Sequence, residues 1–437
     1  ATAGRYGHLA GSARLRGTAG GTGYNVSAAV LDSDGYRDHG QARRSSLNAR
    51  LHRDLESGGR IELVGNHFHA PDAQDPLGLT RAQMQADPRQ ATAVAHDYDT
   101  RKSVRQDQLG LHWRQPLGGG WNLRASSWAG QRDVVQYLAV PPAAQANPLH
   151  SGGVIDLDGA YGGVDARVAW QDAEGRLEVT AGVSVERQRQ DRLGYENFLP
   201  GDGGPRLGVR GALRRNELNT TRSLDQYLQA WWKLAPRWAL QAGARHSQVR
   251  FEANDRYVTA GNPDDSGSVR YSAFTPVAGR VFSAGDDLRP YLSAGRGFET
   301  PTFNELSYRA DGGAGLAFDL RPARSDNLEL GLKWRSDAGT AVEAALAPQA
   351  GDVEAVISPD DVAPATTAAG LMRGPARRPA TAPPRAGRRP VSWRGAASVA
   401  VTVGVTPAAS SPSTMPWETT LVKAGRSNRA VPSTCSR

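Results

Sequence analysis

The clearest structural signal in the sequence is Leu177-Glu-Val-Thr-Ala-Gly-Val-Ser-Val-Glu186, in which an apolar residue occupies every second position. This period of two places successive side chains on opposite faces of a β-strand. The same alternation recurs from Val164 to Gln171 and from Asn327 to Arg335. An amphipathic helix would instead repeat its apolar residues at about every third or fourth position. The sequence therefore predicts strands with one apolar face and one polar face.

Weaker alternation covers most of residues 1–346, and no stretch approaches the ~20 consecutive apolar residues that a membrane-spanning helix needs. The pattern predicts an all-β fold with about fourteen antiparallel strands. We expect these strands at 5–16, 23–31, 42–54, 59–68, 102–114, 121–132, 164–171, 177–186, 224–234, 238–252, 270–283, 289–298, 327–335 and 340–346.

The connections between the expected strands alternate in length. Short turns such as Thr18-Ala-Gly-Gly-Thr22 and Asp172-Ala-Glu-Gly175 are followed by long polar segments. Barrels of the bacterial outer membrane have short periplasmic turns and longer extracellular loops. The alternation therefore predicts a transmembrane β-barrel with long loops at 69–100, 133–159, 190–222, 253–268 and 299–325.

Tryptophans cluster beside the short turns. They are Trp113, Trp121, Trp170, Trp232, Trp238 and Trp334. Amphipathic rings gather at membrane interfaces, so this clustering indicates an aromatic belt on the periplasmic side. Tryptophans that cap hairpins in a soluble β-protein would be an alternative explanation. Trp128 and Trp231 do not fit a belt.

The composition changes near residue 346. Residues 347–437 hold 12 of the 27 prolines, and only Trp393 and Trp417 of the 30 aromatic residues. They also carry a net charge of +6 out of the total of +8, so the strand region is nearly neutral and indicates no nucleic-acid partner. We expect two parts, a partial barrel at 1–346 and a disordered tail at 347–437. The tail is either a natural extension or the product of a frameshift, which we favour.

Two segments carry a family resemblance. Tyr291-Leu-Ser-Ala-Gly-Arg-Gly-Phe-Glu-Thr-Pro-Thr-Phe-Asn-Glu-Leu306 is followed by Leu320-Arg-Pro-Ala-Arg-Ser-Asp-Asn-Leu-Glu-Leu-Gly-Leu-Lys-Trp334. Together they resemble the barrel of TonB-dependent outer-membrane receptors, particularly siderophore-receptor-like members, although Ala323 stands where the family usually has Glu. The motif residues, to which we assign a structural role, are Gly297, Phe298, Pro301, Leu320, Pro322, Leu328 and Leu330.

The resemblance implies uptake of a scarce nutrient across the outer membrane of a Gram-negative bacterium. A ferric siderophore is the favoured substrate, while haem, cobalamin and quinone-type cofactors remain open. The implied partners are outer-membrane lipid and lipopolysaccharide, a small-molecule metal chelate and, for the full-length receptor, the TonB complex. Family barrels have about 22 strands and a plugged lumen. We therefore expect this chain to be an incomplete barrel without plug or TonB box, unable to transport alone.

Two other functions stay open at this point. A passive porin-like channel would also have a charged lumen, and a soluble β-rich adhesin would also alternate in sequence. An enzyme is not expected, because the sequence contains no Gly-x-Ser-x-Gly, His-Glu-x-x-His or Walker motif. No resident cofactor and no structural metal is predicted, and the single cysteine, Cys435, allows no internal disulfide.

Candidate ligand contacts lie where strands are expected to enter external loops. His67 and His69 have the i, i+2 spacing that puts both imidazoles on one strand face, where they could bind a metal or a metal chelate. A solvated pair is the alternative. Arg189, Arg192 and Tyr195 suit an anionic ferric chelate through charge-assisted hydrogen bonds and stacking. The alternative for these three is a charge cluster that faces the lumen or lipopolysaccharide.

A further set of charged residues is expected to face the lumen. Alternation projects Arg245, Glu329 and Lys333 away from the apolar face of their strands. In a complete receptor such side chains would contact a plug, so hydrogen bonds to it are a better expectation than contacts with ligand.

Overall fold

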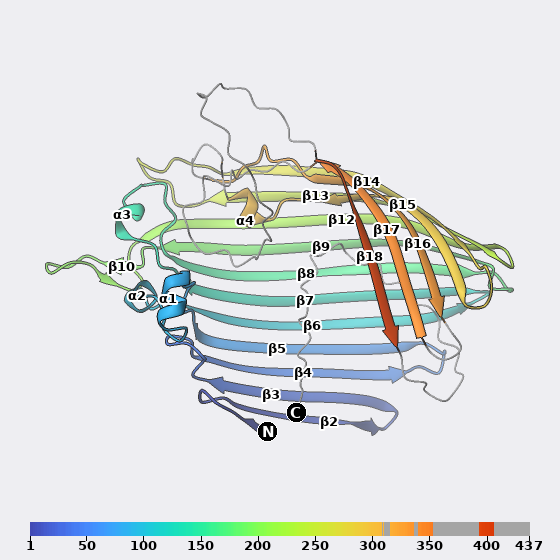
Figure 1. Ribbon diagram of the computed structural model, residues 1–437, viewed down its shortest axis with the longest axis horizontal. Helices are drawn as coiled ribbons and strands as arrows, with labels where there is room; N and C mark the ends of the chain where they lie inside the picture. The colour runs from blue at the N-terminus through green and yellow to red at the C-terminus, as the bar shows by residue number, and fades with distance from the viewer. Residues whose placement is uncertain (308, 310–314, 336–339, 353–392, 406–437) are drawn as a thin grey trace.

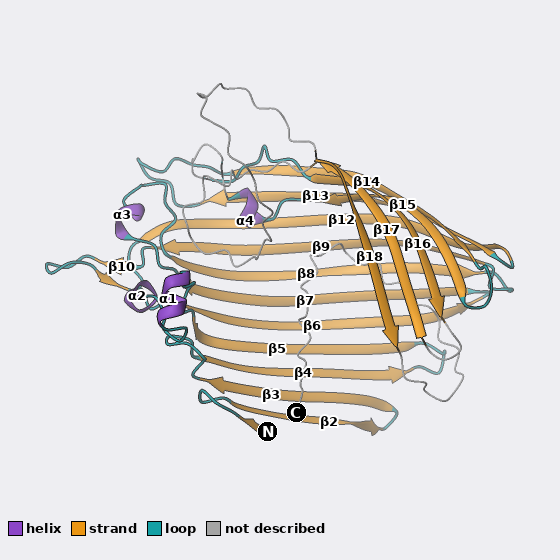
Figure 2. Ribbon diagram, in the orientation of Figure 1, coloured by secondary structure: helices purple, strands orange, loops and turns teal. Residues whose placement is uncertain are grey.

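The computed structural model describes residues 1–307, 309, 315–335, 340–352 and 393–405. Within these residues, sixteen strands form one antiparallel sheet and a separate two-stranded hairpin, β10–β11, projects from a loop (Figure 2). The strands of the sheet are β1 (Thr2–Ala3), β2 (Leu9–Ala19), β3 (Thr22–Ser33), β4 (Ala42–Asp54), β5 (Arg60–Gln74), β6 (Arg101–Gly118), β7 (Trp121–Tyr137), β8 (Val154–Gln171), β9 (Leu177–Tyr195), β12 (Leu213–Ala235), β13 (Trp238–Asp255), β14 (Gly267–Phe282), β15 (Leu288–Glu299), β16 (Ala323–Arg335), β17 (Thr340–Asp352) and β18 (Trp393–Val405).

The sheet is an up-and-down meander. Each strand pairs with its neighbour in the sequence, except that β9 pairs with β12 because β10 (Phe198–Leu199) and β11 (Arg206–Leu207) lie in the intervening loop. All fourteen predicted strands are present, which confirms the fold class. The sheet curls, so that β16 to β18 pass in front of the central strands in Figure 1. No pairing within the described residues joins β1 to β18, so the barrel is incomplete there.

Several strands are longer than the sequence pattern predicts. β5 extends to Gln74, β9 extends to Tyr195 and β12 begins at Leu213, so the loops expected at 69–100 and 190–222 are shorter. Backbone pairing needs no apolar side chain, so it continues where the alternation has faded. These strand ends are a correction to the sequence-based expectation.

The expected disordered tail also needs correction in part. β17 continues past residue 346 to Asp352, and β18 pairs with it from Trp393 to Val405. Valines at every second position from 399 to 405 carry the β18 signal, which the surrounding prolines obscure. Residues 353–392 and 406–437 of the expected tail lie outside the described residues.

Short helices sit in the long connections, at the end of the sheet opposite the short turns (Figure 1). They are α1 (Arg81–Ala86), α2 (Ala93–Asp97), α3 (Pro142–Gln145) and α4 (Phe303–Leu306). Thr80 begins α1 with a capping box, in which the hydroxyl of Thr80 and the side chain of Gln83 satisfy each other's backbone N–H groups. None of the described helices has the length and hydropathy of a membrane span.

One face of the sheet, here called the outer face, carries large apolar side chains in contact with solvent. Examples are Leu15, which is 64% exposed, and Leu330, which is 57% exposed. Other members of this face are Leu47, Leu51, Ile61, Leu63, Leu109, Leu111, Val164, Val183, Val185, Phe274, Leu292 and Leu328. Water-soluble proteins rarely expose an apolar surface of this extent, whereas a barrel in lipid requires one.

The tryptophans follow the same division. Trp113, Trp121, Trp170 and Trp232 share the outer face near the short turns, and Trp238 packs on Phe282 at the rim with ring centroids 4.4 Å apart. Trp128 and Trp231, which did not fit the belt, line the interior instead. The two exceptions thus belong to the opposite face.

Candidate functional site

The opposite face of the sheet, here called the lumenal face, encloses a cavity of about 3610 Å³. Strands β6 to β9 and β12 to β17 wall it, mainly with polar residues. Arg245, Glu329 and Lys333 are among the lining residues, so their predicted lumenal orientation is confirmed. A space of this size and polarity is suited to another polar body or to a hydrated solute.

Asp225 of β12 is the centre of a hydrogen-bonded group on the wall. The guanidinium of Arg245 in β13 binds it with two contacts, Nε to Oδ1 at 2.9 Å and Nη2 to Oδ2 at 2.6 Å. The hydroxyl of Ser247 donates to Asp225 Oδ1 at 2.5 Å. Asp225 is only 8% exposed, so bidentate pairing offsets the cost of burying its charge.

Other lumenal polar groups are paired across strands in the same way. The Tyr227 hydroxyl donates to Asp165 Oδ2 at 3.1 Å, and the Tyr291 hydroxyl donates to Glu329. Lys333 lies 3.6 Å from Glu343. The wall therefore presents both charge signs, held in fixed positions by their partners.

His67 and His69 do not face this cavity. Both lie inside β5 rather than at a strand end, and their odd positions share the outer face with Ile61 and Leu63. His67 Nδ1 lies 2.6 Å from Asp107 Oδ1 of the neighbouring strand. Within the described residues, no group of three or more His, Cys, Asp or Glu side chains is placed to hold a metal ion.

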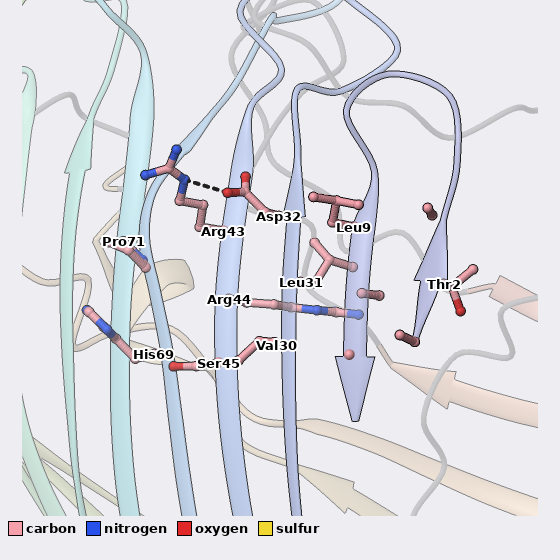
Figure 3. A pocket seen from close by; sticks show the side chains of 14 residues that line it. Thr2, Leu9, Val30, Leu31, Asp32, Arg43, Arg44, Ser45, His69 and Pro71 are labelled. Carbon is pink, nitrogen blue, oxygen red and sulfur yellow. Dashed lines mark ion pairs between the residues drawn. The ribbon is translucent and has the colours of Figure 1, made fainter. Parts of the chain in front are cut away.

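His69 borders a shallow pocket of about 700 Å³ at the N-terminal edge of the sheet. Figure 3 shows its side chain near Ser45, while Arg43 and Asp32 form an ion pair at 3.1 Å on the other side of the pocket. Leu9, Val30 and Leu31 are apolar residues of its lining. The register places the two histidines on one face of β5.

The three residues Arg189, Arg192 and Tyr195 do not form one cluster. All three lie on β9, where the spacing of three sends Arg189 and Arg192 to opposite faces. Arg189 contacts Asp191 at 3.2 Å on the outer face, and Tyr195 lies under the guanidinium of Arg210, 4.6 Å from its ring centroid. Arg192 turns inward, opposite the buried Glu217, and its Nη1 donates to Ser307 Oγ at 3.3 Å.

The loop after β15 folds back over the mouth of the cavity. Leu306 of α4 and Leu316 are fully or nearly fully buried against Phe251 and Tyr271 of the lumenal face. The hydroxyl of Tyr271 also donates to the Leu320 carbonyl oxygen at 2.7 Å. Sequence reasoning missed this apolar cap, although three phenylalanines at 298, 303 and 318 in a segment expected to be a polar loop were a usable signal.

The family-motif residues surround this cap. Phe298 and Leu320 pack against the buried cluster, and Pro301 is buried just after β15 ends. Gly297 lies opposite Ser325, where a Cβ would come within 2.3 Å of the serine hydroxyl. Pro322 precedes β16, and Leu328 and Leu330 belong to the outer face. The motif residues thus lie in β15, in β16 and in the loop between them, where Phe298 and Leu320 hold that loop against the lumenal face.

Charged groups near the mouth have shifted pKa values. Burial, together with the carboxylates of Asp255 and Glu217, raises the pKa of Asp265 to about 6. Burial beside Arg214 and Arg215 lowers the pKa of His150. In both groups burial disfavours the charged form, which raises the pKa of the carboxyl group and lowers the pKa of the imidazole.

Comparison with known proteins identifies the family to which this architecture belongs. A family model described as TonB-dependent receptor-like β-barrel matches residues 52–347. The sheet resembles the ferric citrate transporter FecA, with a TM-score of 0.65 and 17% identity over 80% of this chain and 49% of that one. It also resembles the ferric yersiniabactin uptake receptor FyuA of Yersinia pestis, with a TM-score of 0.62 and 16% identity over 80% of this chain and 53% of that one. The siderophore receptor PiuA of Acinetobacter baumannii has a TM-score of 0.62 and 15% identity, over 80% and 56% of the two chains.

The chain spans about half the length of these solved structures. The matched region contains the strands from β5 to β16, with most of the outer apolar face, and the Gly-Phe-x-x-Pro segment at 297–301. The chain belongs to the TonB-dependent receptor-like β-barrel family.

Proposed function

We propose that this chain is the barrel wall of an outer-membrane receptor that takes up a metal chelate, with a ferric siderophore as the favoured substrate. The proposal includes location in the outer membrane of a Gram-negative bacterium and, for the longer receptor, energy input from the TonB complex. The observation that carries it is the large lumenal cavity, walled by fixed charged pairs and covered at the loop end by the segment after β15.

Support for the substrate class comes from two directions. FecA, FyuA and PiuA are described as a ferric citrate transporter, a ferric yersiniabactin receptor and a siderophore receptor. In this chain, Arg192 extends from β9 toward the loop that covers the mouth. A guanidinium there could bind an anionic chelate through charge-assisted hydrogen bonds.

The five predicted contact residues are not equivalent under this proposal. Arg192 is the proposed ligand contact, because it alone among them lies on the lumenal face. His67, His69, Arg189 and Tyr195 lie on the outer face and are proposed to have no direct role in binding.

Binding of ferric chelates to the full chain, folded in detergent micelles, tests the proposal. Ferric citrate, a ferric catecholate and a ferric hydroxamate are titrated while quenching of tryptophan fluorescence is recorded. We expect saturable binding of at least one anionic chelate, weakened about tenfold by Arg192→Ala because a hydrogen bond to a charged group is lost. His67→Ala is the matched control and should bind like the wild type.

Two results would contradict the proposal. One is the absence of saturable binding for all three chelates by a chain with heat-modifiable gel mobility. The other is an equal loss of affinity in the Arg192→Ala and His67→Ala variants, which would exclude a specific lumenal contact.

A further inference from the structure

Three carboxylates lie close together at the mouth of the cavity, and we call them the acidic cluster. Glu217 of β12 is 3% exposed and faces Asp255 of β13 in the register of the sheet. Asp265, in the loop between β13 and β14, is half-buried and near enough to both residues to be repelled by their charges. Glu217 accepts a hydrogen bond from Arg215 Nε, whereas no ion pair of the described residues includes Asp255 or Asp265. Buried charge without a counter-charge is costly.

Two buried oxygen atoms in this region accept no hydrogen bond from any residue that the structure describes. They are Oδ1 of Asn219, a side chain that is 0% exposed, and Oδ2 of Asp255. The Asn219 amide belongs to the cluster, because its Nδ2 donates to Glu217 Oε2 at 3.2 Å. The reverse orientation of the amide would set two acceptor oxygens against each other. Buried acceptors without a donor are rare and indicate a bound ion or water.

The register allows one ion to contact both oxygens. Asn219 lies opposite Ala253, so Asp255 is its diagonal neighbour on the same face of the sheet. The Cβ atoms of diagonal neighbours are less than about 8 Å apart, and Ca²⁺ binds oxygen ligands at about 2.4 Å. Across the described part of the chain, no group of three or more His, Cys, Asp or Glu is placed to hold a metal ion. A site here therefore combines two carboxylates with an amide oxygen and water, which are ligands that Ca²⁺ accepts.

The apolar cap formed by the loop after β15 approaches the same place. A Cβ at Gly315 would lie 2.9 Å from Asp265 Oδ2, and the φ of Gly315 is +81°. Glycine permits both this close approach and this backbone conformation. An ion bound by Asp255 and Asp265 would thus lie where the wall, the loop before β14 and the cap meet.

We propose that Asn219 Oδ1, Asp255 Oδ2 and the carboxylate of Asp265 bind a calcium ion that holds the cap against the wall. The ion supplies the positive charge that Asp255 and Asp265 lack, and it completes the coordination of the two buried oxygens. Two carboxylates give a site of low charge, so the expected dissociation constant is about 0.1 to 1 mM, as in other extracellular calcium modules. The site goes beyond the proposed chelate uptake, because none of its ligands is the proposed chelate contact.

Terbium luminescence tests the site in the full chain folded in neutral detergent at pH 7.5. Tb³⁺, which prefers the same oxygen ligands as Ca²⁺, is excited through the aromatic residues of the chain and then displaced by calcium or magnesium chloride. The site variants are Asp255→Asn, which can still accept the hydrogen bond from the Tyr257 N–H, and Asn219→Ala. Asp264→Asn is the matched control, because it makes the same change of charge in the same loop at an exposed residue that binds Ser266.

We expect calcium to displace terbium from the wild type at millimolar concentration, and magnesium to do so less well because it demands octahedral geometry. Asp255→Asn should weaken calcium binding about tenfold and Asn219→Ala about threefold, since a charged ligand contributes more than a neutral one. The control should retain the affinity of the wild type. Calcium should also slow hydrogen exchange of residues 256–266 and 315–320 in the wild type, and not in Asp255→Asn.

Three results would overturn the proposal. The first is the failure of about 10 mM calcium to displace terbium from a wild-type chain with heat-modifiable gel mobility, which would leave only water on the buried oxygens. The second is an equal loss of affinity in Asp264→Asn and Asp255→Asn, which would indicate diffuse attraction by negative charge. The third is calcium binding that leaves hydrogen exchange of the cap unchanged. No chelate enters the assay, so a chain that binds calcium but no chelate fails only the proposed function.

Discussion

At the scale of single residues, buried charge is held by paired contacts. Asp225 accepts hydrogen bonds from Arg245 and Ser247 on the neighbouring strand while it is 8% exposed. Such an arrangement fixes the rotamers of two lumenal side chains, and its loss leaves a buried polar group unsatisfied.

Replacement of Asp225 by Ala should therefore destabilise the sheet. We expect the free energy of unfolding to fall by about 1–3 kcal/mol, because Arg245 and Ser247 lose their common acceptor. Urea unfolding in micelles, followed by tryptophan fluorescence, measures this loss. Asp286→Ala, in the exposed turn before β15, is the control and should stay within about 0.5 kcal/mol of the wild type. A loss in the control as large as that in Asp225→Ala would refute the role of the pairing.

Two adjacent loop carboxyls should respond oppositely to pH. The pKa of Asp265 is raised from 3.8 to about 6 by burial and by Asp255 and Glu217, whereas hydrogen bonds from Ser266 lower the pKa of Asp264. A raised carboxyl pKa means that the folded loop binds the proton more tightly than the unfolded loop. The contribution of the Asp265 carboxyl to the stability of the folded loop therefore falls as pH rises from about 4 to 6, and it stays low at higher pH. For Asp264 the contribution is present above the ordinary pKa and is lost as pH falls through the lowered value.

At pH 7.5, Asp265→Asn should accordingly stabilise the folded loop against local opening. We expect a gain in the free energy of opening of about 1 kcal/mol after allowance for solvent screening, and little change near pH 4. Hydrogen exchange of residues 256–266 measures this protection. Asp264→Asn is the matched control and should reduce protection at pH 7.5. The same sign in both variants would show that the electrostatic assignment is wrong.

At the scale of strands, glycines face aromatic rings across the lumenal side of the sheet. Gly182 of β9 lies opposite Tyr227 of β12, and a Cβ at Gly182 would come within 2.4 Å of the ring. Gly331 lies opposite Tyr291 in the same manner, with a Cβ distance of 2.2 Å. Each ring covers backbone that a glycine leaves bare, and each hydroxyl reaches a carboxylate.

Gly182→Ala should force Tyr227 out of this position and weaken the β9–β12 pairing by about 1–3 kcal/mol. The unfolding free energy in urea is again the readout. Gly203→Ala is the control, because nothing lies within 4 Å of its Cβ position. Adding Tyr227→Ala to Gly182→Ala should cost less than the sum of the two single changes. Additive losses would argue against contact between the two positions.

Sequence alternation predicted the strands because their two faces meet different media, an apolar one outside and a polar one inside. The pattern could not give the strand ends, since beyond Glu186 pairing continues through polar residues on β9. For the same reason the pattern did not show that Arg189, Arg192 and Tyr195 lie within a strand. In a loop Arg189, Arg192 and Tyr195 could converge, but in a strand their odd and even positions separate them. The cap over the mouth depends on contacts between the loop after β15 and strands β13 and β14, which local patterns do not encode.

At the scale of the whole molecule, the proposed function requires that one face of the sheet meets lipid and the other faces the lumen. The outer face carries the large apolar side chains and four of the tryptophans. The lumenal face carries the paired charges around the cavity. The proposed function rests on this division.

Trp231 and Trp232 test that division directly, because they are adjacent in β12 and lie on opposite faces. In chains that retain only one tryptophan, folded into vesicles, fluorescence quenching by brominated lipids is compared for the two positions. We predict strong quenching of Trp232, at the depth of the interface, and little quenching of Trp231. Equal quenching of both residues, or stronger quenching of Trp231, would contradict the assignment of the outer face to lipid.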